Sequence, residues 1–199
     1  MKIFFKWMII CVFASSLSAC GYNNFQEKDE TVKAAWSEII NQYQGRADLV
    51  PKIAQIVKSY ATHEEDTFEA VAKARSAATS FQITPEVLNN PTVFKNFQQV
   101  QGNLSSALSR LMAVSERYPQ LKSDGLHRDA QSQLEGIENR IKVARNRYII
   151  AVQDYNILTR SFPSNLTAMV MHYKIKPSFT TSNEQAISSS PDVDFGGRK

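Results

Sequence analysis

The sequence predicts an all-α protein, an elongated antiparallel bundle of about four long helices anchored at its N-terminus. Apolar residues recur at alternating spacings of four and three over long stretches, which is the period of a helix face that packs against partner helices. No stretch shows the alternation with a period of two that a half-buried strand requires. Segments rich in Pro and Asn separate the periodic stretches and mark the loops.

The first helix is predicted from about residue 23 to residue 61. Its apolar positions recur at this spacing with one charged member, Arg46; they are Val32, Trp36, Ile39, Tyr43, Val50, Ile53, Val57 and Tyr60. Pro51 lies inside the helix, where it removes one backbone hydrogen bond and predicts a kink. Gly45 weakens the same region further.

Two further helices are predicted over residues 64–80 and 92–117. Thr62 and Glu65 have the spacing of a capping box at the start of the second helix. The inner face of that helix is predicted to carry Phe68, Val71, Arg75 and Ala78. Pro85 and Pro91 mark the following loop, the third helix presents Phe97, Leu104, Leu108 and Leu111, and Pro119 ends it.

The fourth helix has the clearest pattern in the chain. The four-three spacing continues without a break through Ala130, Leu134, Ile137, Ile141, Ala144, Tyr148, Ala151, Tyr155, Leu158 and Phe162. Ser164 is a candidate cap for a short apolar segment over 165–173. From residue 177 the chain is rich in Ser and Thr without a period, so residues 177–199 are predicted to be a loosely ordered tail.

The first twenty residues have the layout of a secretory signal. Lys2 and Lys6 form a positive region, an apolar run from Trp7 to Ala14 follows, and small residues precede Cys20. The sequence Leu17-Ser18-Ala19-Cys20 resembles a bacterial lipobox, which predicts that residues 1–19 are removed and that Cys20 is lipid-modified. The alternative is an uncleaved single-pass anchor. Either way residues 20–176 form a bundle outside the cytoplasm, at the cell membrane or, because Gly21 is not an aspartate, at the outer membrane.

Composition excludes two classes of protein. Both cysteines, Cys11 and Cys20, lie in the leader, so the exported part has no disulfide. Removing Lys2 and Lys6 lowers the formal net charge from +4 to +2, and no basic stripe with interleaved aromatic residues is present. A nucleic-acid partner is therefore not expected.

The mature chain resembles the LemA family over nearly its whole length. The resemblance is carried by short stretches that include Gly21-Tyr22-Asn23, Arg46-Ala47-Asp48-Leu49-Val50-Pro51, Val71-Ala72-Lys73-Ala74-Arg75, Gly136-Ile137-Glu138-Asn139-Arg140-Ile141, Tyr155-Asn156, Lys176-Pro177-Ser178-Phe179 and Val193-Asp194-Phe195-Gly196. Gly45 departs from the basic residue expected there, and Ile150 from a polar one. The resemblance implies a helical bundle that faces away from the cytoplasm, is tethered at its N-terminus and has no agreed biochemical activity. It supplies no catalytic residues.

Polar residues on or beside the inner helix faces are the candidate site: Arg46, Asp48, Arg75, Glu138, Asn139 and Arg145. A charge in a core needs partners, because an unpaired buried ion costs several kcal/mol. These residues could line a pocket for a ligand or partner peptide. Alternatively they form interhelical pairs, or bonds associated with the Pro51 kink, that fix the register of the helices. Polar residues at such positions commonly specify pairing, which favours the second interpretation.

No catalytic or metal site is predicted. The sequence has no nucleophile elbow, P-loop or Gly-rich dinucleotide turn. A di-metal bundle needs two Glu-x-x-His motifs, and the nearest match is a single Asp124-x-x-His127, with His63 and His172 far away in the sequence. Glu135 and Glu138 share a helix face without a cleft. A metal-dependent hydrolase is thus the weakest hypothesis, and no cofactor is expected.

The apolar segment after the fourth helix has two interpretations. Leu166, Met169, Val170 and Tyr173 either close the end of the bundle or contact lipid or a partner. The leading functional hypothesis is a non-catalytic envelope scaffold that binds another envelope protein. The alternative is a lipid-binding module that uses residues 166–173.

Overall fold

The computed structural model describes residues 2–179, with side chains from residue 21 onward. Its long helices are α1 (Lys2–Lys58), α2 (Glu65–Ser80), α3 (Pro91–Ala113) and α5 (Gly125–Arg160). The short ones are η1 (Pro85–Leu88), η2 (Val114–Glu116), α4 (Pro119–Ser123) and α6 (Ser164–Val170). The described residues contain no strand, so the predicted all-α class is confirmed.

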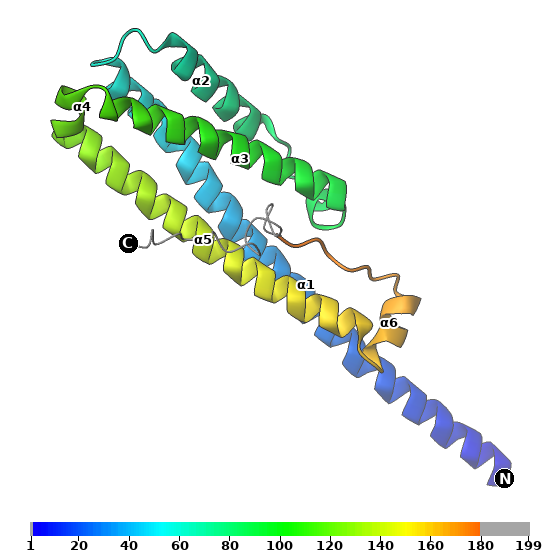
Figure 1. The fold of residues 1–199 in the computed structure, drawn as a ribbon. Coiled ribbons are helices and arrows are strands. Elements are labelled where there is room, and N and C mark those ends of the chain that lie inside the picture. The colour runs from blue at the N-terminus through cyan, green and yellow to red at the C-terminus, as the bar shows by residue number, and fades with distance from the viewer. Residues whose placement is uncertain (1, 180–199) are drawn as a thin grey trace, which may run out of the picture.

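The bundle is built from two antiparallel helix pairs, α1 with α5 and α2 with α3 (Figure 1). Contacts along the first pair run in opposite directions: Tyr60 near the end of α1 donates to Asp124 before α5, and Lys28 meets Asp154 near the other end of α5. The α1 helix extends past the bundle toward the N-terminus, and α6 lies beside it where the bundle ends (Figure 1).

The α1 helix does not end at Pro51 but continues to Lys58. Proline has no backbone N–H, so Pro51 leaves the carbonyl oxygen of Ala47 without its usual helical partner. Arg75 of α2 supplies one, because its Nε donates to the Ala47 oxygen at 2.9 Å. The proline thus creates an acceptor through which α2 is fixed against α1.

Aromatic side chains join the two helix pairs at mid-bundle. The ring of Trp36 in α1 packs against Phe94 and Phe97 of α3 and against Tyr148 of α5, with ring centroids 4.9 to 5.8 Å apart. Phe97 also contacts Tyr43 and Phe81. Edge-on and tilted aromatic pairs add to the energy of apolar burial, so this cluster is a main contribution to cohesion between the pairs.

Three local predictions at helix ends are wrong. The capping box of Thr62 and Glu65 does not form, because α2 begins at Glu65 and its N-cap is Glu64, with no side-chain capping bond. The Glu64 carboxylate binds Arg117 and Tyr118. Ser164 is the first residue of α6 rather than its cap. Phe162 lies beyond α5 with 81% of its surface exposed, because the helix ends at Arg160 before the periodic pattern does.

The predicted tail begins too early. Residues 177–179 pack on the bundle: Tyr148 donates to the Pro177 carbonyl at 2.9 Å, and Phe179 is buried against Phe94 and Tyr148. Just before them, the amide of Asn156 binds both the N–H and the carbonyl of Lys176. The backbone of this extended segment is hydrogen-bonded to side chains of α5 and not to a neighbouring turn or strand. Such a segment has no apolar period, so the sequence pattern could not predict that it packs on the bundle. Residues 180–199 lie outside the described part of the chain.

The leader is described only as backbone, which is helical and continuous with the rest of α1. The side chain of Cys20 is outside the described residues, so its lipid modification and the removal of residues 1–19 stay predictions. Within the described part of the chain, no helix combines the length and the apolar character needed to cross a membrane.

Candidate functional site

A small polar cavity lies at mid-bundle, where α1, α3, α5 and the segment before residue 180 meet. Its volume is about 160 Å³, and it is lined by Tyr43, Arg46, Gln98, Gln101, Gly102, Ser105, Glu138, Ile141, Arg145 and Phe179. Three of the six predicted site residues, Arg46, Glu138 and Arg145, come together here.

Arg46 is the centre of this site and is only 1% exposed. One terminal nitrogen donates to the Ser105 hydroxyl and pairs with Glu138 Oε1 at 3.0 Å. The other donates to the backbone and side-chain oxygens of Gln101 at 3.1 and 2.6 Å. The Nε of Arg46 is buried without a partner among the described residues. Four hydrogen bonds to α3 and α5 fix α1 in register with both helices.

Arg145 also lines this cavity and is half-buried. Its guanidinium is stacked 4.4 Å above the ring of Phe179. No carboxylate among the described residues lies within ion-pair distance of it, in contrast to Arg46. Burial raises the pKa of the neighbouring Tyr43 hydroxyl, against the opposing effect of the two arginines, so this hydroxyl is neutral at physiological pH.

The other predicted site residues lie elsewhere. Arg75 binds the Ala47 carbonyl on the α2 side of α1. Asp48 is exposed and accepts from Gln44 one turn earlier, and Asn139 is exposed on the outer face of α5. Gln101 and Ser105 were missed, although Gln101 could have been found, because it occupies an inner position between Phe97 and Leu104.

The candidate metal motif Asp124-x-x-His127 is a helix cap. The Asp124 carboxylate accepts from the backbone N–H of His127 at 3.1 Å and from the Tyr60 hydroxyl. Burial lowers the pKa of His127, and neither ring nitrogen has a partner among the described residues. No three His, Cys, Asp or Glu side chains converge in the part of the chain whose side chains are described.

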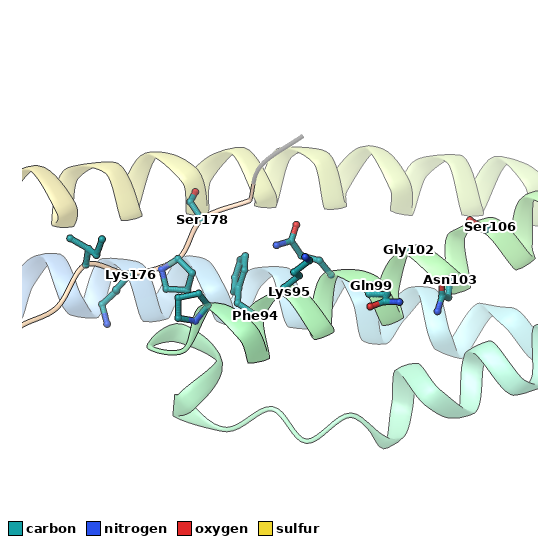
Figure 2. Close-up of a pocket in the computed structure, with 12 residues that line it drawn as sticks. Phe94, Lys95, Gln99, Gly102, Asn103, Ser106, Lys176 and Ser178 are labelled. Atoms are coloured by element: carbon teal, nitrogen blue, oxygen red, sulfur yellow. The ribbon is translucent and has the colours of Figure 1, made fainter. Parts of the chain in front are cut away.

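A wider groove borders the cavity along α3 and shares Gln98 and Gly102 with it. Its volume is about 1000 Å³. Lys95, Gln99, Asn103 and Ser106 of α3 line it, and Lys176 and Ser178 form its other end (Figure 2).

The second candidate surface consists of five apolar residues in and beside α6, which we call the apolar face of α6: Leu166, Met169 and Val170 in the helix, and Phe162 and Met171 on either side of it. All five are exposed, Met169 by 73% and Val170 by 74%. They therefore do not close the bundle in this structure, whereas Ala168 on the opposite side of the helix is buried. Tyr173 was predicted to share this surface with Leu166, Met169 and Val170. It does not, because its ring packs against Phe25 of α1, with the ring centroids 4.8 Å apart.

The α6 helix contacts α1 directly after the predicted leader. A Cβ atom built on Gly21 would lie only 2.8 Å from the Thr167 hydroxyl, so α6 touches α1 at the residue that follows Cys20. The absence of a side chain at Gly21 permits this approach.

Comparison with known families decides the relationship that the residue pattern suggested. The model of the LemA family matches residues 35–195. This chain belongs to the LemA family. The match extends past Phe179, so it includes sixteen residues beyond the described part of the chain.

Proteins similar to this chain include two magnetosome proteins of Paramagnetospirillum magneticum (strain AMB-1), MamQ 1 and MamQ 2, each 24% identical over 169 residues. The magnetosome protein MamQ of Magnetospirillum gryphiswaldense is 23% identical over the same length. Each alignment includes 77% of this chain but only 62% of the relative, so the chain spans less than two thirds of the relatives' length.

Proposed function

We propose that this LemA protein is a non-catalytic helical bundle of the bacterial cell envelope, held at a membrane by its N-terminus and by the apolar face of α6. The observation that carries the proposal is the position of that face: five exposed apolar side chains lie in and beside α6, and Thr167 of the same helix contacts Gly21, the residue after the predicted lipidation site. An exposed group of large apolar side chains of this kind commonly marks a membrane or protein contact.

The geometry favours lipid as the surface that covers α6. Whether the leader is retained or replaced by a lipid on Cys20, the chain leaves the membrane near Gly21, and Thr167 of α6 touches that residue. Exposed Arg160 and Lys174 flank the segment in sequence and suit anionic headgroups.

The test is vesicle binding by residues 21–199, which lack the leader and the lipid. Fully burying one apolar side chain stabilises by about 1.5–3 kcal/mol, so Met169→Asp with Val170→Asp should weaken partitioning at least tenfold. Partitioning is measured by cosedimentation with vesicles of phosphatidylethanolamine and phosphatidylglycerol.

The matched control is Val143→Asp with Ile150→Asp on α5. These two residues are also apolar and about half exposed, at 51% and 53%, but they lie away from α6. This control should bind vesicles as the unmodified domain does. Equal binding by the α6 variant and the unmodified domain would refute the lipid contact, as would an equal loss in both double variants.

A second candidate function, contact with another envelope protein, is favoured by the groove along α3. Its volume and its mixture of amide, hydroxyl and apolar walls suit an extended peptide segment (Figure 2). This contact is compatible with attachment through α6, because the groove lies on a different helix.

Site-specific photocrosslinking in intact cells tests the second candidate. A crosslinker at Asn103 in the groove is expected to capture one defined envelope protein, identified by mass spectrometry. The control position is Gln133, which is exposed on α5. Capture of the same proteins from both positions, or of nothing from Asn103, would count against a partner in the groove.

A further inference from the structure

The mid-bundle cavity holds more positive charge than its described residues neutralise. Arg46 and Arg145 contribute two cations, and Glu138 is the one carboxylate among the lining residues. Arg46 uses this carboxylate, at 3.0 Å. The facing residues from the other elements are neutral: Tyr43 from α1, Gln98, Gln101 and Ser105 from α3, and Phe179 from the C-terminal segment.

Unused hydrogen-bond donors accompany this charge. The Nε of Arg46 is buried and has no partner among the described residues. The guanidinium carbon of Arg145 lies over the ring of Phe179, and its N–H groups donate no hydrogen bond to another described side chain. An arginine positioned in this way is suited to bind a planar anion through two parallel hydrogen bonds.

We propose that this cavity is a binding site for a carboxylate group, with Arg145 as its ion-pair partner. A monoanion matches the single excess positive charge, whereas a phosphate dianion would leave the cavity with a net negative charge. The volume of about 160 Å³ accommodates a group the size of an acidic side chain and is smaller than the 300–1000 Å³ typical of sites for larger ligands.

The carboxylate can come from two sources. The chain continues beyond Phe179 and contains Glu184, Asp192 and Asp194. The alternative is a carboxylate from outside the chain, which would enter from the adjoining groove, since the groove and the cavity share Gln98 and Gly102. The site lies at mid-bundle away from α6, so its test is independent of the vesicle experiment.

The experiment titrates the full-length chain in detergent micelles with sodium acetate, against sodium chloride at equal ionic strength. Binding is followed by NMR of the arginine Nε–H signals of Arg145, assigned from Arg145→Lys, and of Arg46, which lines the same cavity and reports binding in the variants at residue 145. If the source is external, the full-length chain binds acetate saturably, and Arg145→Gln weakens binding at least about tenfold. If the source is the chain itself, the unmodified chain does not respond, whereas the triple variant Glu184→Gln, Asp192→Asn, Asp194→Asn binds acetate through Arg145.

Two control variants separate binding from a structural role. Arg145→Lys keeps the charge and should retain weakened binding. Arg147 lies two residues after Arg145, and its exposed guanidinium pairs with Glu38. The variant Arg147→Gln should therefore bind acetate like its parent chain. The proposal is overturned if neither the unmodified chain nor the triple variant responds to acetate, or if Arg145→Gln binds as tightly as its parent.

Discussion

Replacing Arg46 by alanine is expected to lower the free energy of unfolding by about 3 kcal/mol. The substitution removes a fully buried guanidinium and leaves the Gln101 side chain and the Ser105 hydroxyl without their partner. Glu138 is about one third exposed and can be rehydrated, which places the expected loss at the lower end of the range for breaking a buried ion pair. Chemical denaturation of residues 21–199, followed by circular dichroism, measures the change.

Two further substitutions calibrate this result. Arg46→Lys should lose less than alanine but should not restore full stability, because an ammonium group cannot reproduce the planar fork that reaches both α3 and α5. Arg147→Ala removes an exposed pair with Glu38 and should change stability by at most about 1 kcal/mol. If Arg46→Ala were no more destabilising than Arg147→Ala, the Arg46 network would not be a stabilising element.

The polar residues were interpreted either as fixing the register of the helices or as binding a ligand. This result would assign the first role to Arg46 and leave the second to Arg145. Arg46 has four hydrogen bonds to neighbouring helices, which is the arrangement of a residue that fixes register. Arg145 has a stacking partner and no described carboxylate, which is the arrangement of a binding residue. Register fixing and ligand binding are therefore not exclusive alternatives in this cavity.

Helix periodicity predicted much of the fold because burial in a bundle follows the same period as the sequence. The inner positions from Ala130 to Tyr155 are buried in α5, and Arg46 was recognised because it interrupts such a pattern. Gln101 interrupts the pattern of α3 in the same way, so the same rule identifies it as an inner polar residue, and the structure shows that its partner is Arg46.

The remaining features depend on contacts between residues far apart in the sequence. Asn156 and Tyr148 bind the backbone of residues 176 and 177, and no local pattern reveals such a contact. The apolar character of α6 could be recognised in the sequence. However, α6 is only two turns long, so its sequence has no period that shows which side of the helix is buried. The side that it turns toward the bundle includes Thr167, which contacts Gly21 more than 140 residues earlier in the chain.

Replacing Phe97 by alanine is expected to destabilise the bundle by about 3–5 kcal/mol. Phe97 has no exposed surface, and its ring contacts Trp36 and Tyr43 of α1 and Phe81 after α2. Removing the ring leaves a cavity at the junction of the two helix pairs, and three aromatic neighbours lose a partner. Denaturant unfolding measured by circular dichroism gives the loss.

Phe162→Ala is the matched control, because it makes the same chemical change at a phenylalanine that is 81% exposed. A surface substitution of this kind changes stability by no more than about 0.5 kcal/mol, so the control should unfold like the unmodified domain. It should nevertheless weaken vesicle binding, since Phe162 belongs to the apolar face of α6. A loss of stability in Phe162→Ala comparable to that in Phe97→Ala would show that Phe162 is part of the core, and the lipid contact would then lose its largest side chain. Stability and membrane attachment are therefore expected to depend on different phenylalanines of the same chain.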